Sequence, residues 1–191
     1  PATGVYVFED SDKDGNLFNE GDYVIRGNTD PEFYGGFQYN IQYRGVELNF
    51  FFDYRKQIGA NYLSIAGSRQ PGFIINQPKF VSDRWQAPGN VAAYQQYTSR
   101  FGSSASIAGS YLSVSDAKYS NASFVRCKNI SVSYRLPANI LKRLKISSSR
   151  IYVEGQNLFT LTPYEGSDPE TQDVYVLPPL RTIAAGIQLS F

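Results

Sequence analysis

Five segments of this chain alternate between apolar and polar residues, each over about ten positions. The last is RTIAAGIQLSF, residues 181–191, in which Ile183, Ile187 and Leu189 fall on one side and Gln188 and Ser190 on the other. Successive side chains of a β-strand point to opposite faces, so a period of two predicts a strand. About ten residues is also the length that a tilted strand needs to cross a bilayer.

The other four alternating segments have the same two-sided character, with one apolar face and one polar face. They cover residues 33–43, 46–55, 124–136 and 150–159. The two-residue connection Arg44-Gly45 between the first pair predicts a tight hairpin. We expect the polar faces to line a lumen, with the residues Gln38, Asn40, Asn49, Ser131, Glu154 and Gln188.

The connections between these segments alternate in length. Residues 137–149 form a short connection with one expected helical turn after Pro137, whereas 56–123 and 160–181 are long and rich in Gly, Ser, Pro and Asn. Long loops at one end and short turns at the other are typical of outer-membrane barrels. The sequence therefore predicts an all-β fold, an antiparallel transmembrane β-barrel segment with long extracellular loops and short periplasmic turns.

This prediction divides the chain into four parts. Residues 1–32 are an extracellular loop with an Asp-rich turn, and 33–55 a barrel hairpin. Residues 56–123 are a long extracellular loop. The remainder, 124–191, contains three strands, the periplasmic turn 137–149 and the extracellular loop 160–181.

The composition argues against several classes of function. The net charge of +1 gives no general attraction to nucleic acid. His is absent and Cys127 is the single cysteine, which removes histidine-based triads, most catalytic zinc sites and any internal disulfide. We predict no enzyme activity, no catalytic residue and no required cofactor.

An Asp-rich stretch, DSDKDGNLFNEGD at residues 10–22, resembles the start of a calcium-binding loop. Asp10, Asp12 and Asp14 alternate before a Gly, and Asn16 has a backbone carbonyl in a suitable position. The twelfth position from Asp10 is Gly21 instead of a bidentate acid. A calcium site and a polar turn without metal both remain open.

Several loop side chains are candidates for contact with a ligand. Trp85, Tyr94, Tyr97 and Tyr164 can stack on a substrate or on a lid protein, or they can pack the loops internally. Asp168 and Glu170 lie in the motif GSDPE, where a Pro-stiffened turn favours a structural role over acid/base chemistry.

Several stretches resemble the carboxy-terminal part of the SusC/RagA family of TonB-dependent transporters from Bacteroidota. They are QNLFTLTPYEGSDPE at 156–170, NASFVRCKNISVSYRLP at 121–137 with Phe124 and Cys127 as departures, IRGNTDPEFYGGF at 25–37, RWQAP at 84–88 and the terminal LSF. The resemblance implies the last five or so strands of a 22-stranded barrel in the outer membrane. It also implies an amino-terminal plug that TonB pulls on, a SusD-like lipoprotein lid, glycan or oligopeptide cargo, and contact with lipid or lipopolysaccharide.

Five strands with a lipid-facing side cannot close, and their open edges would leave backbone groups unpaired in hydrocarbon. We therefore expect a fragment, or one piece of a barrel that another polypeptide completes. The alternative is a secreted, calcium-stabilised β-sandwich module that binds carbohydrate.

Overall fold

The fold is described from a computed structural model that covers residues 3–17, 19–25, 27–65, 72–77, 79–173 and 175–191. The chain divides into two compact units. We call Pro1–Asn28 with Ala60–Ser120 the loop unit, and Thr29–Gly59 with Asn121–Phe191 the sheet unit.

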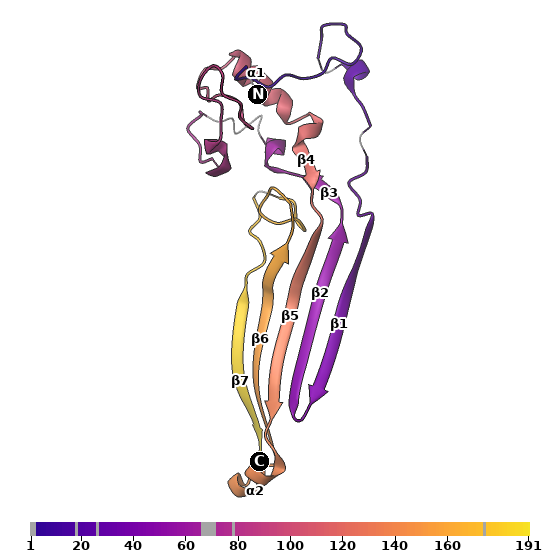
Figure 1. The fold of residues 1–191 in the computed structure, drawn as a ribbon, viewed down its shortest axis with the longest axis vertical. Coiled ribbons are helices and arrows are strands. Elements are labelled where there is room, and N and C mark those ends of the chain that lie inside the picture. Colours follow the sequence, from indigo (N-terminus) through magenta and orange to yellow (C-terminus); the bar gives the residue numbers. More distant parts are fainter. Residues whose placement is uncertain (1–2, 18, 26, 66–71, 78, 174) are drawn as a thin grey trace. The chain divides into compact units, whose positions relative to one another are not determined.

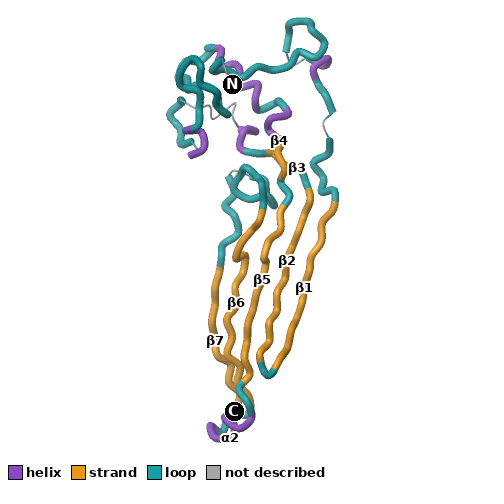
Figure 2. The backbone as a smooth tube through the Cα atoms, viewed as in Figure 1, coloured by secondary structure: helices purple, strands orange, loops and turns teal. Residues whose placement is uncertain are grey.

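The sheet unit contains one five-stranded antiparallel sheet in the order β1-β2-β5-β6-β7 (Figures 1 and 2). Its strands are β1 (Phe33–Tyr43), β2 (Val46–Lys56), β5 (Phe124–Arg135), β6 (Ser148–Leu161) and β7 (Thr182–Ser190). They are 9 to 14 residues long, as a tilted membrane strand requires. The outer strands β1 and β7 each pair on one side among the described residues, so both edges of the sheet are open. The predicted antiparallel all-β fold is confirmed.

Compact connections join the strands at one end of the sheet. Arg44 (φ 46°) and Gly45 (φ 87°) adopt the left-handed backbone of a two-residue hairpin turn, whose twist matches that of the flanking strands. The helix α2 (Ala138–Leu144) follows Pro137, where a helical turn is expected, and Lys145 caps its end with a left-handed backbone, φ 55°. No helix in the described part of the chain is both long and apolar enough to span a membrane.

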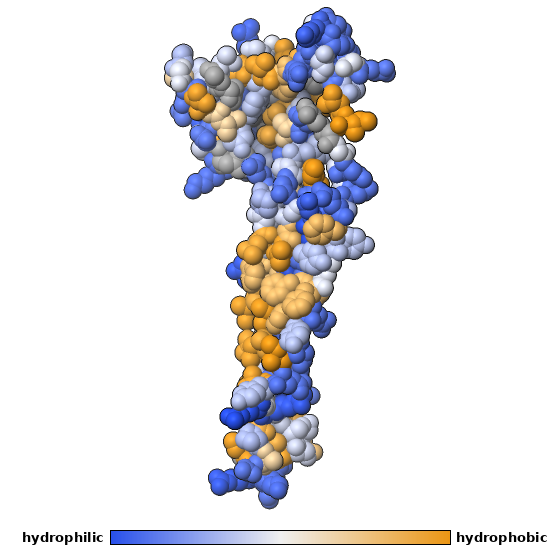
Figure 3. Space-filling view, turned by 45° about the vertical axis from the view of Figure 1, so that its right-hand side comes forward, coloured by the Kyte–Doolittle hydropathy of each residue, from blue (hydrophilic) through white to orange (hydrophobic). Residues whose placement is uncertain are grey.

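One face of the sheet is apolar and exposed. Rings on β1, β2 and β6 contact one another across this face with centroid separations of 5.7–6.2 Å, namely Phe37, Tyr39, Phe50, Phe52 and Phe159. On β7, Ile183 and Ile187 are 70% and 67% exposed within the chain. Figure 3 shows a continuous hydrophobic patch over the strands. Such a face is unfavourable in water, so it needs lipid or another apolar surface as a cover.

The loop unit contains one longer helix and several short ones. The helix α1 (Ser104–Leu112) begins after Ser103, whose hydroxyl accepts a hydrogen bond from the backbone N–H of Ser106. The apolar positions Ala105, Ala108 and Leu112 are buried, as is Val81. α1 lies in the segment 56–123, for which the sequence predicts a long loop, because a Ser- and Ala-rich stretch gives only a weak amphipathic signal. Its short elements are the 3-10 turns Glu20–Asp22, Tyr62–Ile65, Lys79–Ser82 and Asp116–Lys118. The strands β3 (Ile58–Ala60) and β4 (Tyr119–Asn121) pair with each other where the chain passes from one unit to the other.

Candidate functional site

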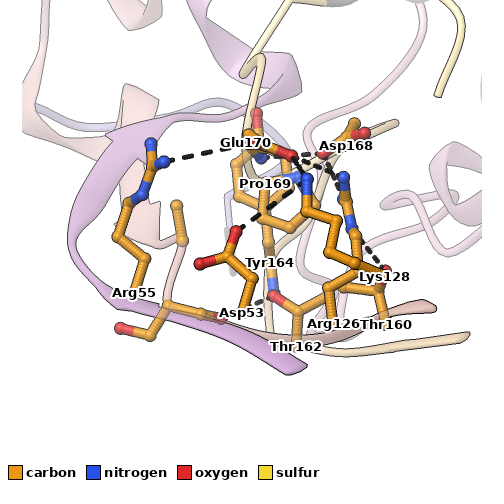
Figure 4. A network of polar contacts seen from close by, with 12 residues as sticks. Asp53, Arg55, Arg126, Lys128, Thr160, Thr162, Tyr164, Asp168, Pro169 and Glu170 are labelled. Carbon is orange, nitrogen blue, oxygen red and sulfur yellow. Dashed lines mark hydrogen bonds and ion pairs between the residues drawn. The ribbon is translucent and has the colours of Figure 1, made fainter. Parts of the chain in front are cut away.

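A network of charged residues lies on the polar face of the sheet, at the end where β2 leaves it and β5 enters it (Figure 4). Its centre is Arg126 on β5, whose side chain is 3% exposed. The guanidinium donates to Asp168 Oδ1 and to Glu170 Oε2, each at 2.7 Å. Its Nε donates to Thr160 Oγ1 at 2.9 Å. The Asp168 side chain has an exposed fraction of 0%, so this ion pair is buried.

Two further cations surround Glu170. Lys128 Nζ donates to Glu170 Oε2 at 2.9 Å and lies 3.9 Å from Asp53 Oδ2, and Arg55 lies 3.8 Å from Glu170 Oε1. Three cations and three carboxylates thus balance each other. Buried charges are costly unless they are paired, and this balance offsets the desolvation cost of Arg126 and Asp168.

The guanidinium groups of Arg55 and Arg126 both lie near the ring of Phe124. Phe124 on β5 is 3% exposed, and the guanidinium carbons of Arg55 and Arg126 lie 5.6 Å and 5.3 Å from its ring centroid. Arg55 is the cross-strand partner of Phe124 on β2. Both arginines can therefore gain cation–π attraction from this ring.

The same residues hold the loop that follows β6. Asp168 Oδ1 accepts a hydrogen bond from the Glu170 N–H at 2.7 Å, and the Asp168 carbonyl accepts one from Gln172 N–H at 2.9 Å. Gln57 Nε2 donates to the Pro169 carbonyl at 2.6 Å. The motif GSDPE is thereby tied to residues from β2 and β5. Each of the three carboxylates is paired with a cation. The network therefore anchors the loop through ion pairs.

Tyr164 completes this anchored loop. Thr162 donates from its hydroxyl to the Ser123 carbonyl at 2.7 Å and accepts the Tyr164 N–H at 3.1 Å. The Tyr164 side chain is 9% exposed, and burial, assisted by the negative charge of Asp168, raises the pKa of its phenol. This leaves little ring surface for a ligand, so the geometry favours packing over substrate contact for Tyr164.

The predicted lumen-lining residues share one face of the sheet. Asn40, Asn49, Ser131 and Glu154 are successive cross-strand partners and form one row over β1, β2, β5 and β6. Asn40 and Asn49 both donate to Glu47 and are also hydrogen bonded to each other.

Gln38 and Gln188 lie in other rows of the same face. Gln38 is two residues from Asn40 on β1, and Gln188 is the cross-strand partner of Arg150, which is four residues from Glu154 on β6. Residues an even number of positions apart on a strand share a face. The side on which a lumen would lie stays a prediction.

The Asp-rich loop gathers a different set of acids from the predicted one. Ligand oxygens of Asp10, Asp12 and Asp22 lie within 4.8 Å of one another. Asp14 accepts hydrogen bonds instead from the Asn16 N–H at 2.7 Å and from Asn19 Nδ2 at 2.7 Å. Asp22, one residue after the twelfth position, thus joins Asp10 and Asp12 in this cluster. Three carboxylates in this arrangement fit the oxygen ligands that calcium prefers.

Three of the predicted contact aromatics lie together in the loop unit. The backbone N–H of Trp85 donates to the backbone carbonyl of Tyr94 at 2.8 Å, and the guanidinium of Arg84 lies 3.9 Å from the Tyr97 ring centroid. Trp85 packs on Gly4, where an added Cβ would stand 2.9 Å from the indole. Tyr97 remains 39% exposed. Trp85 has a packing role, and Tyr97 keeps surface for a ligand.

Comparisons with known proteins identify relatives along the whole chain. It is 27% identical to TonB-dependent receptor P3 of Formosa agariphila over 98% of the chain and 19% of that receptor. It is 36% identical to TonB-dependent receptor SusC of Bacteroides thetaiotaomicron over 41% of the chain and 8% of SusC. No family model matches the sequence. This chain is a relative of the TonB-dependent receptors. It spans about a fifth or less of the length of these relatives.

Solved structures support the same relationship at the level of the fold. The RagAB peptide importer in its open-open state matches with a TM-score of 0.67 and 24% identity, over 97% of this chain and 20% of the solved one. The RagAB peptide transporter matches with a TM-score of 0.64 and 26% identity, over 87% and 18%. The resemblance to SusC/RagA is confirmed. The curated relatives are named receptors and not enzymes, in agreement with the prediction of no catalytic activity.

Alternation along the sequence did not predict Arg126 and Lys128 as site residues. Strict alternation from Asn129 places both on the apolar face, but the register shifts between Cys127 and Asn129. A β-bulge of this kind turns the following side chains to the other face. Two charges at apolar positions of a strand were the available signal.

Proposed function

We propose that this chain is a wall segment of a SusC-like TonB-dependent transporter in the bacterial outer membrane. The observation that carries the proposal is the up-and-down sheet, with an exposed apolar face on one side and polar rows on the other. Strands of 9 to 14 residues suit a bilayer, and the relatives are TonB-dependent receptors.

The open edges at β1 and β7 require partners in a membrane, since unpaired backbone groups are costly in hydrocarbon. The remaining strands of the barrel would supply these partners, and a plug would lie against the polar rows. TonB would act on that plug, and a SusD-like lipoprotein would close over the loops. The cargo would be glycans or oligopeptides.

The charged network around Arg126 would hold the last long loop at a fixed place on the wall. Beyond the anchored motif, Tyr175, Leu177 and Leu180 are 67%, 85% and 81% exposed. An apolar loop tip on a rigid base is suited to binding a lid or a cargo molecule.

The β-sandwich module is disfavoured by the sheet topology. A sandwich needs two sheets that cover each other's apolar faces. The described residues form one five-stranded sheet and one two-stranded sheet.

Membrane insertion of the whole protein tests the proposed function. We expect the protein to fractionate with the outer membrane, to need detergent for solubility and to change its gel mobility on heating. A protein that is monodisperse without detergent would refute the proposal. Uptake of labelled oligosaccharide or oligopeptide by cells with and without the protein would then decide the cargo class.

The Asp-rich loop would hold a calcium ion through Asp10, Asp12 and Asp22. Asp10 Oδ1 is buried and has no hydrogen-bond partner within the described ranges, which leaves it able to bind a cation. The ion would stabilise the loop by neutralising three adjacent carboxylates. Isothermal titration of the protein with calcium tests this, and no saturable heat would refute it.

A further inference from the structure

The turn end of the sheet unit carries a concentration of positive charge. Six of the chain's 18 basic residues lie in residues 43–47 and 134–151, together with one of its 17 acidic residues, Glu47. The basic residues are Arg44, Arg135, Lys142, Arg143, Lys145 and Arg150. The chain as a whole has a net charge of +1. This end is therefore strongly basic, and the rest of the chain is acidic.

The fold itself leaves most of this charge without a partner. Lys142, Arg143 and Lys145 are exposed, and within the described ranges their side chains form no ion pair or hydrogen bond. Glu47 is engaged by Asn40, Asn49 and Arg135 on the polar face. Packing of the sheet does not explain why this short connection has three cations and no acid.

Apolar and aromatic groups lie beside the cations. Arg44 stacks on Tyr43, with its guanidinium carbon 5.2 Å from the ring centroid, and Tyr43 is 66% exposed. Ile140, on the same short helix α2 as Lys142, is 44% exposed. Tyr43 belongs to the apolar face of β1. Figure 3 shows hydrophilic residues gathered beyond the hydrophobic patch at this end.

A band of cations and amphipathic rings at the edge of an apolar face is the arrangement that binds a membrane surface. The rings lie at the boundary of the hydrocarbon, and long basic side chains reach the phosphates. We infer that Arg44, Lys142, Arg143 and Lys145 form a binding surface for the headgroups of anionic phospholipids. We call these four residues the turn-end patch. This inference rests on the proposed placement of the sheet in a membrane.

The patch suits diffuse phosphate charge at a lipid surface better than a single bound anion. Its cations are exposed and come from two separate connections, so no enclosed cradle surrounds one ligand. Each Lys or Arg near an anionic surface contributes about a fivefold gain in binding. Loss of three should therefore lower the preference for anionic lipid by roughly a hundredfold.

The test uses the whole transporter in detergent, with phosphatidylglycerol and phosphatidylcholine added in parallel and bound lipid counted by native mass spectrometry. We expect phosphatidylglycerol to bind more tightly. The triple variant Lys142→Gln/Arg143→Gln/Lys145→Gln should lose this preference, and so should the unchanged protein in high salt.

A matched control removes the same charge from the loop unit. Lys13, Lys79 and Arg100 are exposed there, and Lys13→Gln/Lys79→Gln/Arg100→Gln should keep the lipid preference. Equal binding of the two lipids, or equal loss in both triple variants, would overturn the inference. Heat-dependent gel mobility, measured in the same samples, reports the barrel separately. A transporter that passes this check but has no lipid preference refutes the patch alone, whereas failure of the check refutes the membrane proposal itself.

Discussion

The buried ion pair between Arg126 and Asp168 should control the stability of the loop after β6. Asp168→Asn removes the negative charge while keeping the shape and an oxygen that can accept the hydrogen bond from Glu170 N–H. The Asp168 side chain has an exposed fraction of 0%, so the cost is that of breaking a buried pair, about 3–5 kcal/mol. Arg126 keeps Glu170 at 2.7 Å, so we expect the lower value, about 3 kcal/mol.

Hydrogen exchange of the whole protein in detergent measures this loss locally. The backbone amides of Glu170 and Gln172 donate to Asp168 and report opening of the loop. A loss of about 3 kcal/mol corresponds to exchange that is roughly a hundredfold faster. Amides within the β1–β2 pairing should keep their rates, because they belong to the strand ladder.

Two further variants separate charge from general damage. Glu170→Gln changes a group that is 28% exposed and should cost about 1 kcal/mol or less. In the double variant Arg126→Met/Asp168→Asn, neither charge remains. Its loss of stability should therefore be about 1–3 kcal/mol smaller than the summed losses of Arg126→Met and Asp168→Asn measured singly. Unchanged exchange in Asp168→Asn, or additivity within about 0.5 kcal/mol, would refute the reasoning.

Three other perturbations test other parts of the molecule. Leu189→Arg on the apolar face should cost about 2–4 kcal/mol in a folding titration in lipid, whereas Gln188→Arg should cost much less, and equal costs would contradict the assignment of faces. Asp12→Ala should abolish calcium heat if the Asp-rich loop binds the ion, and undiminished binding would exclude this carboxylate. Burial raises the pKa of Tyr6 from 10.0 to about 12, so the folded state keeps a proton that the unfolded chain releases. The stability from this phenol is complete below pH 10 and is lost as the pH rises to about 12; Tyr6→Phe should flatten that decline in urea unfolding, and an unchanged decline would refute it.

Alternation was sufficient to predict the five long strands, whereas the three-residue strands β3 and β4 are too short to show it. A period of two sustained over about ten residues identifies a two-faced strand, and the hairpin at Arg44-Gly45 fixes the register of β1 on β2. The polar row from Asn40 to Glu154 follows from that register, because cross-strand partners share a face.

The charged network was not predictable in the same way. Alternation describes a regular strand, and the bulge between Cys127 and Asn129 breaks the regularity where the site is built. The pairing of Arg126 with Asp168 also joins residues separated by 42 positions, which no local pattern records. Asp22 replaced Asp14 in the acidic cluster for a related reason, since the fold of the loop decides which carboxylates converge.

The two ends of the sheet use charge in opposite ways. At the loop end, three cations pair with three carboxylates of the same chain. These ion pairs hold the loop after β6 against the sheet. At the turn end, the cations of α2 have no acidic partner within the described residues, so their charge is left to act on something outside the chain. An internally neutral end can position a binding loop without attracting lipid. An uncompensated end can hold the strands at a membrane surface, and the apolar face between the two ends has the strand length that such a placement needs.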